Sequence, residues 1–287
     1  MSNQQGVTFV GIGAIGLPMA RQLALNGYAV TGVDPIVSQH DRARTAGISP
    51  VASISGAPPA STVIVMVATP EQLDGLVTTA LETTDVSEQC WVLMSTVGPD
   101  SVRSQAARLE ARGAEVIDAP VTGGVARAAT GSLTIFAAGN PSSVDRVGDL
   151  LSRLGTVRSV GSTVGEGQAI KVVNQHLCSV HIVAAAEALS LARSLGLDRA
   201  QVLDLISSGA AGSWMLSDRG PRMLAGTDVD VTSTINIFVK DSTLVADAAR
   251  SSGAQTPLLD TAKQRYEQAA LMGLAVRDDS RVIETYS

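Results

Sequence analysis

Lys171 is a cation in a stretch of sequence that otherwise predicts an uncharged helix. It lies in the stretch GQAIKVVNQHL, residues 167–177, and no Asp, Glu, Lys or Arg occurs between Lys171 and Glu187. Asn174, Gln175 and Cys178 follow at helical spacings, so they share one face with the lysine. A solvated face would explain such a stripe, but solvated faces normally carry several charges. The stripe is therefore a candidate site that combines one cation with hydrogen-bonding groups.

A second candidate site is the glycine motif in VTFVGIGAIGLPMA. Gly11, Gly13 and Gly16 form a GxGxxG between a predicted strand and a predicted helix, which is the setting of a dinucleotide fingerprint. Asp34 ends the next predicted strand, where a carboxylate accepts hydrogen bonds from ribose hydroxyls. A turn before Pro35 would also suit an aspartate, but it would not explain the spacing from the glycines. The carboxylate would repel a ribose phosphate, and no arginine adjoins it, so NAD is favoured over NADP.

Thr122, Gly123 and Gly124 lie where a predicted strand is followed by a predicted helix. A hydroxyl and open backbone amides could bind a carboxylate there. The sequence alone favours a plainer interpretation, in which a helix cap is followed by a flexible glycine pair. Both interpretations stay open at this point.

The predicted elements that position these residues change in kind along the chain. The first half alternates helical stretches with β-branched runs, which are residues 7–10, 28–33, 62–67, 91–95, 114–118 and 132–138. Several runs are apolar almost throughout, as in strands buried on both faces, so we predict a doubly wound α/β fold with a parallel sheet. From about residue 163 the sequence turns to Ala/Leu-rich helical runs. We therefore predict two domains, 1–162 and 163–287.

Composition narrows the class of function. The chain has 287 residues, of which 45% are hydrophobic and 17% charged, which is enough to bury two cores. The net charge of −6 gives no basic surface for nucleic acid or an anionic membrane. Cys90 and Cys178 are expected to be reduced thiols, and His176 and His181 lie off the lysine stripe, so no metal site is predicted. With neither an export signal nor a membrane span expected, a cytoplasmic protein acting on small molecules is predicted.

Five ordered motifs resemble the β-hydroxyacid dehydrogenase family over essentially the whole chain. They are FVGIGAIGLPMA, STVGPD, DAPVTGG, GEGQAIKVVNQ and FVKD. The resemblance implies an N-terminal NAD-binding Rossmann domain and an all-helical substrate and dimerisation domain, joined by a long helix. It also implies a homodimer or homotetramer.

The resemblance implies roles for individual residues. Lys171 would be the catalytic lysine of a reversible hydride transfer between NAD and a small hydroxy acid. The residues expected at the substrate are Thr122, Gly123, Gly124, Asn174, Gln175, Ser213, Trp214 and Arg219. Those expected at the cofactor are Gly11, Gly13, Ala14, Ile15, Gly16, Asp34, Val67, Ala68, Thr96, Lys240 and Asp241.

Residues 210–224, AAGSWMLSDRGPRML, most resemble the branch of the family that acts on L-threonate. The alternatives within the family are 3-hydroxyisobutyrate dehydrogenase and tartronate semialdehyde reductase. Two other classes remain possible on this scaffold, a non-catalytic dinucleotide sensor and an imine reductase, and Lys171 disfavours both. Thr122 and Gln175 replace the more frequent serine and asparagine, and Ser242 stands at a usual leucine position. Which acid is preferred, in which direction the reaction runs, and the choice between dimer and tetramer are left open.

Overall fold

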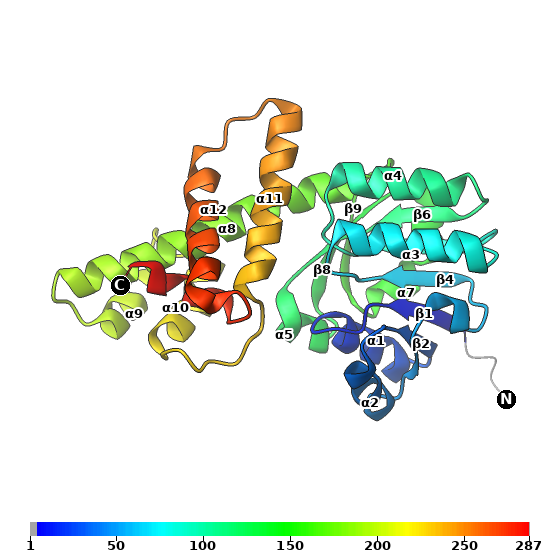
Figure 1. Cartoon of the computed structure of the whole chain (residues 1–287), viewed down its shortest axis with the longest axis horizontal. Helices are drawn as coiled ribbons and strands as arrows, with labels where there is room; N and C mark the ends of the chain where they lie inside the picture. Colours follow the sequence, from blue (N-terminus) through cyan, green and yellow to red (C-terminus); the bar gives the residue numbers. More distant parts are fainter. Residues whose placement is uncertain (1–4, 287) are drawn as a thin grey trace. The chain divides into compact units, whose positions relative to one another are not determined.

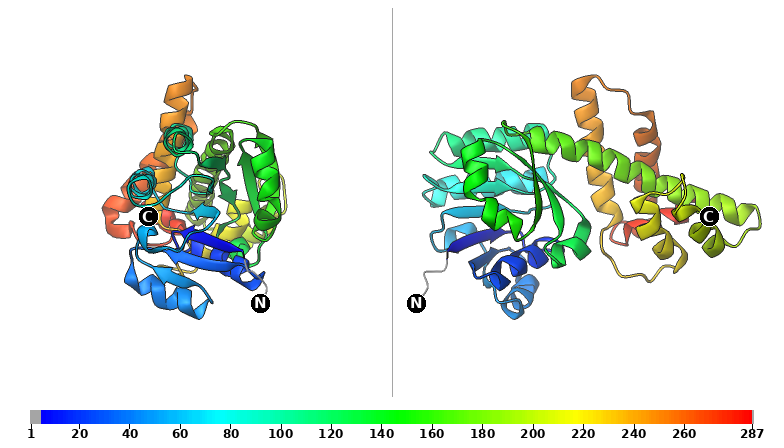
Figure 2. Two further views of the ribbon diagram at one scale, coloured as in Figure 1. Left: turned by 90° about the vertical axis from the view of Figure 1, so that its right-hand side faces the viewer. Right: turned by 180° about the vertical axis from the view of Figure 1, so that it is seen from behind.

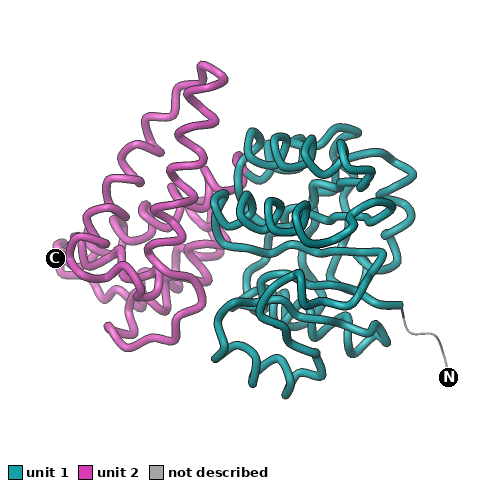
Figure 3. Tube along the Cα trace, turned by 45° about the vertical axis from the view of Figure 1, so that its right-hand side comes forward, with its two compact units in different colours: residues 1–171 teal, residues 172–287 magenta. Residues whose placement is uncertain are grey.

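The computed structural model describes residues 5–286, which form two compact units that divide between Lys171 and Val172 (Figure 3). The division lies inside helix α8, Glu166–Ser194. The boundary predicted at 162/163 precedes this helix. The first turns of this helix belong to the first unit and its later turns to the second.

The described part of the first unit contains a nine-stranded sheet in the order β3-β2-β1-β4-β5-β6-β8-β7, with β9 paired to β8. Its strands are β1 Gly6–Val10, β2 Ala29–Val33, β3 Ser49–Val51, β4 Thr62–Val65, β5 Cys90–Leu93, β6 Glu115–Asp118, β7 Val121–Thr122, β8 Leu133–Ala138 and β9 Gly155–Gly161. From β3 to β6 all neighbours are parallel, whereas β8 runs antiparallel to β6 and β7. The doubly wound prediction is therefore confirmed, and each of the six predicted runs contains a strand.

Three strands were not predicted from the sequence. β3 and β7 are only three and two residues long, and β9, which pairs with β8, has no fully buried residue. A strand without buried residues needs no continuous apolar run, so the pattern that indicated the central strands is missing from β9.

Helices cover both faces of the sheet (Figure 1). They are α1 Gly16–Leu25, α2 Val37–Thr45, α3 Pro70–Thr83, α4 Pro99–Glu110, α5 Gly124–Ala129, α6 Pro141–Arg146 and α7 Gly148–Ser152. Successive strand residues point to opposite faces, so Phe9 packs in the core beneath α1 while Val10 packs in the core beneath α3 and α4. Both faces of β1, β4 and β5 are therefore buried, which explains their apolar sequences.

The strand order also places the ligand site. The chain leaves β1 for β2 on one side and later returns to β4 on the other side, so the order reverses between β1 and β4. Ligands of doubly wound sheets bind outside the carboxyl ends of the strands at such a switch point. The loops after β1, β4, β5 and β7 leave the sheet at this edge, so they are the candidates for ligand binding.

The second unit is helical in its described residues. It contains the later turns of α8, then α9 Arg199–Ser207, α10 Trp214–Leu224, α11 Ile235–Ser252, α12 Pro257–Ala269, a π turn Ala270–Leu274 and a 3₁₀ segment Asp279–Tyr286. α11 and α12 lie side by side as an antiparallel pair (Figure 2), and the rings of Phe238 and Tyr266 stack between them at 5.1 Å. Ser242 is buried on α11, and its hydroxyl donates a hydrogen bond to the carbonyl of Phe238. This bond satisfies the polar group that replaces the usual leucine.

α8 is long and apolar enough to cross a membrane by length and composition alone. Its most apolar window is 44% buried inside the protein. Ile182, Ala186 and Leu189 belong to the hydrophobic core of the second unit. α8 therefore serves as the core helix of that unit.

Candidate active site

The three glycines of the loop between β1 and α1 differ in whether the fold has room for a side chain. Gly11 has a φ of +86°, and a side chain there would overlap the carbonyl oxygen of Met66. A side chain on Gly16 would overlap the carbonyl oxygen of Gly11. At Gly13, by contrast, an added Cβ would find no atom within 4 Å. The fold itself thus requires two of the glycines, and the open third position fits the close approach of a pyrophosphate.

Asp34 follows β2 directly and is buried, as the sequence predicts for a ribose ligand. Its Oδ2 accepts a hydrogen bond from the Ile12 amide at 3.1 Å, and its Oδ1 accepts one from the Ile36 amide at 2.9 Å. The carboxylate is thereby fixed beside the glycine loop. A carboxylate oxygen can accept more than one hydrogen bond, so ribose hydroxyls can still donate to it. Asp34 can be both a turn residue and a cofactor ligand.

The loops after β4 and β5 lie at the same edge of the sheet. After β4, the Ala68 amide donates to Gln72 Oε1 at 2.8 Å, and Thr69 caps α3. These bonds hold the segment that contains Val67 and Ala68, both predicted to contact the cofactor. After β5 comes Thr96, which is also predicted to contact the cofactor.

A buried glutamine that sequence reasoning missed holds the loop after β5. The Oε1 atom of Gln168 accepts hydrogen bonds from the amides of Val97 and Gly98, each at 3.1 Å. Its Nε2 donates to the Ser95 carbonyl at 2.9 Å and to Asp118 Oδ1 at 3.1 Å. Gln168 precedes Lys171 by three residues, so the polar stripe of α8 begins one turn earlier than we predicted. That spacing is the sequence signal that could have revealed it.

Asp118, at the end of β6, is the second group that was missed. Its Oδ2 accepts hydrogen bonds from the amides of Gly165 and Gln168, each at 2.9 Å, so it caps the first turn of α8. Burial raises the pKa of the Asp118 carboxyl to about 6, while the hydrogen bonds from Gln168 and Gly165 act to lower it. The ionised carboxylate is the form that accepts the three hydrogen bonds from Gly165 and Gln168.

The loop after β7 is built around two glycines in the left-handed region. Gly123 has a φ of +133° and Gly124 a φ of +69°. α5 begins at Gly124 with Gly123 as its N-cap, and no side chain caps it. The hydroxyl of Thr122 therefore does not cap this helix, and its contact with a substrate carboxylate stays a prediction.

Lys171 lies one turn beyond Gln168 and is buried, with 6% of its surface exposed. Further along α8, Asn174 Nδ2 donates to Gln175 Oε1 at 2.8 Å. Gln175 Nε2 donates in turn to Asp241 Oδ2, and the other oxygen of Asp241 forms an ion pair with Lys240 Nζ at 2.8 Å. In the second unit, the amides predicted at the substrate are thus linked to the acid–lysine pair predicted at the cofactor.

Comparisons with known proteins agree with these features. Residues 6–170 match the family model described as the NAD binding domain of 6-phosphogluconate dehydrogenase. Residues 165–286 match the one described as NAD-binding of NADP-dependent 3-hydroxyisobutyrate dehydrogenase. A protein named L-threonate dehydrogenase from Cupriavidus necator is 33% identical over 100% of this chain and 97% of its own length.

The chain belongs to the β-hydroxyacid dehydrogenase family. It is an NAD-dependent oxidoreductase that acts on a small hydroxy acid. A crystal structure described as 3-hydroxyisobutyrate dehydrogenase from Salmonella typhimurium is 30% identical and superposes with a TM-score of 0.88 over 98% of this chain and 100% of that one. A protein named NAD-dependent L-serine dehydrogenase from Pseudomonas aeruginosa is 29% identical over 96% of both chains.

For this dehydrogenase, three residues expected at the substrate have other partners within the helical unit. Ser213 caps α10, where its hydroxyl accepts a hydrogen bond from the Leu216 amide at 3.0 Å. The guanidinium of Arg219 donates two bonds to Asp279, at 2.9 and 2.8 Å, and lies 5.8 Å from the ring of Trp214. The substrate contacts of Ser213, Trp214 and Arg219 stay predictions.

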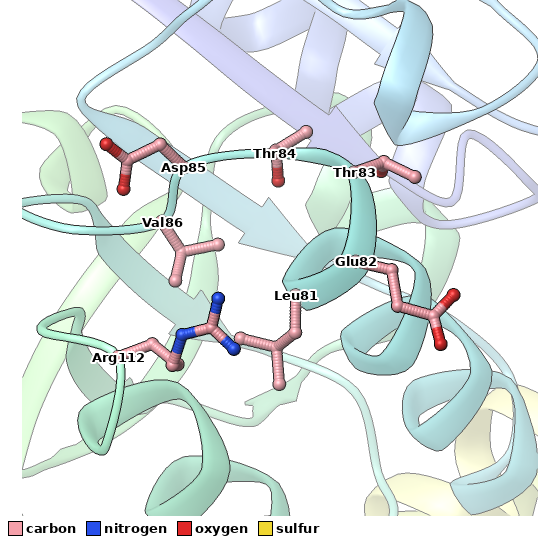
Figure 4. Close-up of a pocket in the computed structure, with 7 residues that line it drawn as sticks. All are labelled: Leu81, Glu82, Thr83, Thr84, Asp85, Val86 and Arg112. Atoms are coloured by element: carbon pink, nitrogen blue, oxygen red, sulfur yellow. The ribbon is translucent and has the colours of Figure 1, made fainter.

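A separate cavity of about 300 Å³ in the Rossmann unit lies where α3 ends (Figure 4). Residues 81–86 and Arg112 line it, and the Arg112 side chain points toward the space between Leu81 and Val86. Residues 81–86 precede β5 and Arg112 precedes β6, so the cavity lies at the amino ends of these strands. Dinucleotides bind at the carboxyl ends of the strands, so this cavity is not the cofactor site.

Proposed function

We propose that this dehydrogenase oxidises L-threonate, or a closely similar polyhydroxy acid, with NAD. The observation that carries the proton-transfer part of the proposal is the burial of Lys171 on α8, one turn beyond the capped start of the helix. The choice of acid is supported by the relative named for L-threonate, whose similarity spans the whole chain, and by the resemblance of residues 210–224 to that branch.

Lys171 is the proton-transfer group of the proposed reaction. In oxidation, its neutral Nζ accepts the proton of the reacting hydroxyl, and in reduction the protonated amine returns it. The Thr122 hydroxyl and the backbone at Gly123 and Gly124 bind the carboxylate of the acid. Asn174 and Gln175 hydrogen-bond the remaining hydroxyls.

The Rossmann unit fits the dinucleotide through the open position at Gly13 and the fixed carboxylate of Asp34. When bound, NAD supplies the hydride acceptor. Thr96 and Lys240 also contact the cofactor in this proposal, and Asp241 orients Lys240 through their ion pair. We further propose a cytoplasmic homodimer or homotetramer, on the strength of the family resemblance, and sedimentation of the purified protein distinguishes the two.

Substrate choice is the first expected result. A four-carbon sugar acid needs polar partners beyond its carboxylate, which Asn174 and Gln175 supply, whereas 3-hydroxyisobutyrate needs an apolar wall for its methyl group. We expect kcat/KM for L-threonate to exceed that for 3-hydroxyisobutyrate by at least about tenfold. Formation of NADH is measured with L-threonate, D-glycerate, 3-hydroxyisobutyrate and L-serine.

A variant of Gln175 tests whether its side-chain amide sets the substrate preference. Gln175→Leu removes the amide that distinguishes a polyhydroxy acid, so it should lower the preference for L-threonate over 3-hydroxyisobutyrate. A wild-type preference for the methyl-bearing acid, or for L-serine, would replace L-threonate as the substrate while leaving Lys171 as the proton-transfer group.

Cofactor choice is the second expected result. The Asp34 carboxylate accepts charge-assisted bonds from ribose hydroxyls and repels a ribose phosphate, so wild-type kcat/KM should be at least about tenfold higher with NAD than with NADP, which corresponds to about 1.4 kcal/mol. Asp34→Asn keeps an acceptor for the Ile12 amide but removes the charge, so it should narrow this ratio. Equal use of both cofactors by the wild type would contradict the role of Asp34.

A further inference from the structure

One side chain, Gln168, holds the residues on both sides of Thr96. Its Nε2 donates to the carbonyl of Ser95, and its Oε1 accepts from the amide of Val97. The backbone that carries Thr96 is thus fixed before and after that residue by the two ends of a single amide. Gln168 is fully buried, so neither bond competes with water.

The same amide has no spare hydrogen-bonding capacity. An amide offers two donor hydrogens and two acceptor lone pairs, and Gln168 uses all four on Ser95, Val97, Gly98 and Asp118. The arrangement is also directional, because exchanging the nitrogen and oxygen would turn a donor toward the two amides and an acceptor toward the Ser95 carbonyl. The side chain therefore has one orientation.

Asp118 fixes the backbone of Gln168 as well as its side chain. Its Oδ2 accepts the amide hydrogens of Gly165 and Gln168, and its Oδ1 accepts from Gln168 Nε2. Between these two residues, a side chain on Gly167 would lie 2.6 Å from the Phe136 carbonyl oxygen. The first turn of α8 is thus pressed against β6 and β8 in a single register.

Lys171 follows Gln168 by three residues, which is one turn and about 4.5 Å of helix rise. A shift or rotation of this first turn would therefore displace the lysine and the segment around Thr96 together. The four hydrogen bonds of the Gln168 amide fix the distance between the first turn of α8 and the loop that contains Thr96.

We propose that Gln168, oriented by Asp118, is a positioning residue that fixes Lys171 relative to the loop of Thr96, and through it sets the geometry of proton and hydride transfer. This inference rests on the proposed function of Lys171. Gln168 itself touches neither substrate nor cofactor. A displacement of about 1 Å at a reacting group can lower turnover about a hundredfold. We expect a loss of kcat of up to this size when the bonds of Gln168 are removed.

The test is Gln168→Leu in the full-length protein, which keeps the approximate volume and removes all four bonds. We expect kcat to fall by about 10- to 100-fold, while KM for the acid changes by less than about threefold. The carboxylate-binding loop makes none of the bonds to Gln168, which is the reason for the small change in KM.

Gln105→Leu is the matched control. Gln105 is also buried in the Rossmann unit, where it bonds Asp74 and Arg108 between α3 and α4. Its loss removes two bonds instead of four, so it should lower the thermal midpoint by less than Gln168→Leu does and leave kcat unchanged. If Gln168→Leu does not fold, Gln168→Asn keeps a buried amide but shortens it by one methylene, so it cannot reach Ser95, Val97 and Gly98 as the glutamine does, and the same loss of kcat without a rise in KM for the acid is expected.

Two outcomes separate this inference from the proposed function. If Lys171→Ala abolishes turnover but the kcat of Gln168→Leu equals that of Gln105→Leu, the positioning role is wrong and the proposed function stands. If Lys171→Ala keeps its turnover, the proposed function fails, and with it the reason for positioning that residue.

Discussion

Lys171→Ala is expected to lower kcat on the preferred hydroxy acid by roughly two to four orders of magnitude, the usual contribution of a positioned acid or base. Without the amine, no group at this point of α8 can accept the hydroxyl proton as the hydride leaves. The affinity for NADH should barely change, because Gly13 and Asp34 supply the predicted cofactor contacts independently of Lys171. Turnover and an NADH titration are measured on the same preparation.

Folding should survive this substitution, since alanine is a good helix former and no buried charge is created. Lys263→Ala is the control, because Lys263 is a partly exposed lysine on α12 with an ion pair to Glu267. It should change the free energy of unfolding by less than about 1 kcal/mol and leave turnover intact. Added small primary amines should partly restore the Lys171→Ala variant. Near-normal turnover without them would show that another group transfers the proton.

Gly13→Ala is expected to weaken NADH binding by about 5- to 150-fold, which corresponds to about 1–3 kcal/mol of overpacking. An added Cβ meets no protein atom within 4 Å, so the cost arises only when a pyrophosphate approaches the loop. Stability should stay the same or rise by up to about 1 kcal/mol, because alanine restricts the unfolded chain more than glycine does.

Gly75→Ala is the matched control for the glycine loop. Gly75 lies within α3, where an added Cβ also meets nothing within 4 Å. Its substitution should stabilise the helix slightly and leave NADH affinity unchanged. If Gly13→Ala bound NADH as tightly as Gly75→Ala, the pyrophosphate would have to be placed elsewhere. Gly16→Ala would be less informative, because its side chain would overlap Gly11 even in the free protein.

The sequence was informative wherever a physical requirement is local. Strands buried on both faces must be apolar throughout, so the central parallel strands could be predicted from their composition. The glycine triplet and Asp34 could be predicted because a pyrophosphate turn and a ribose ligand recur at set distances along one strand–helix–strand unit. β9 escaped prediction for the converse reason, since a strand without buried residues does not need an apolar run.

The partners of polar side chains were harder to predict, because those partners lie far away in the sequence. The sequence predicts Arg219 at the substrate but gives no sign of Asp279, 60 residues away, to which its guanidinium is bonded. For Thr122 the sequence alone favoured a helix cap, and the structure gives that position to Gly123. In both cases the residue type was compatible with several partners, and only the fold shows which of them lies within reach.

The sequence by itself determined the central parallel strands, the glycine triplet and the family, because these follow from short patterns with fixed spacing. Only the tertiary structure revealed Gln168 and Asp118, whose hydrogen bonds join residues 47 to 73 positions apart. A hydrogen bond depends on where two atoms lie in space. The type of a polar residue shows that it can form such a bond, but it does not show which distant residue is the partner. The register of Lys171 is therefore a property of the packed first unit rather than of the helix that contains it.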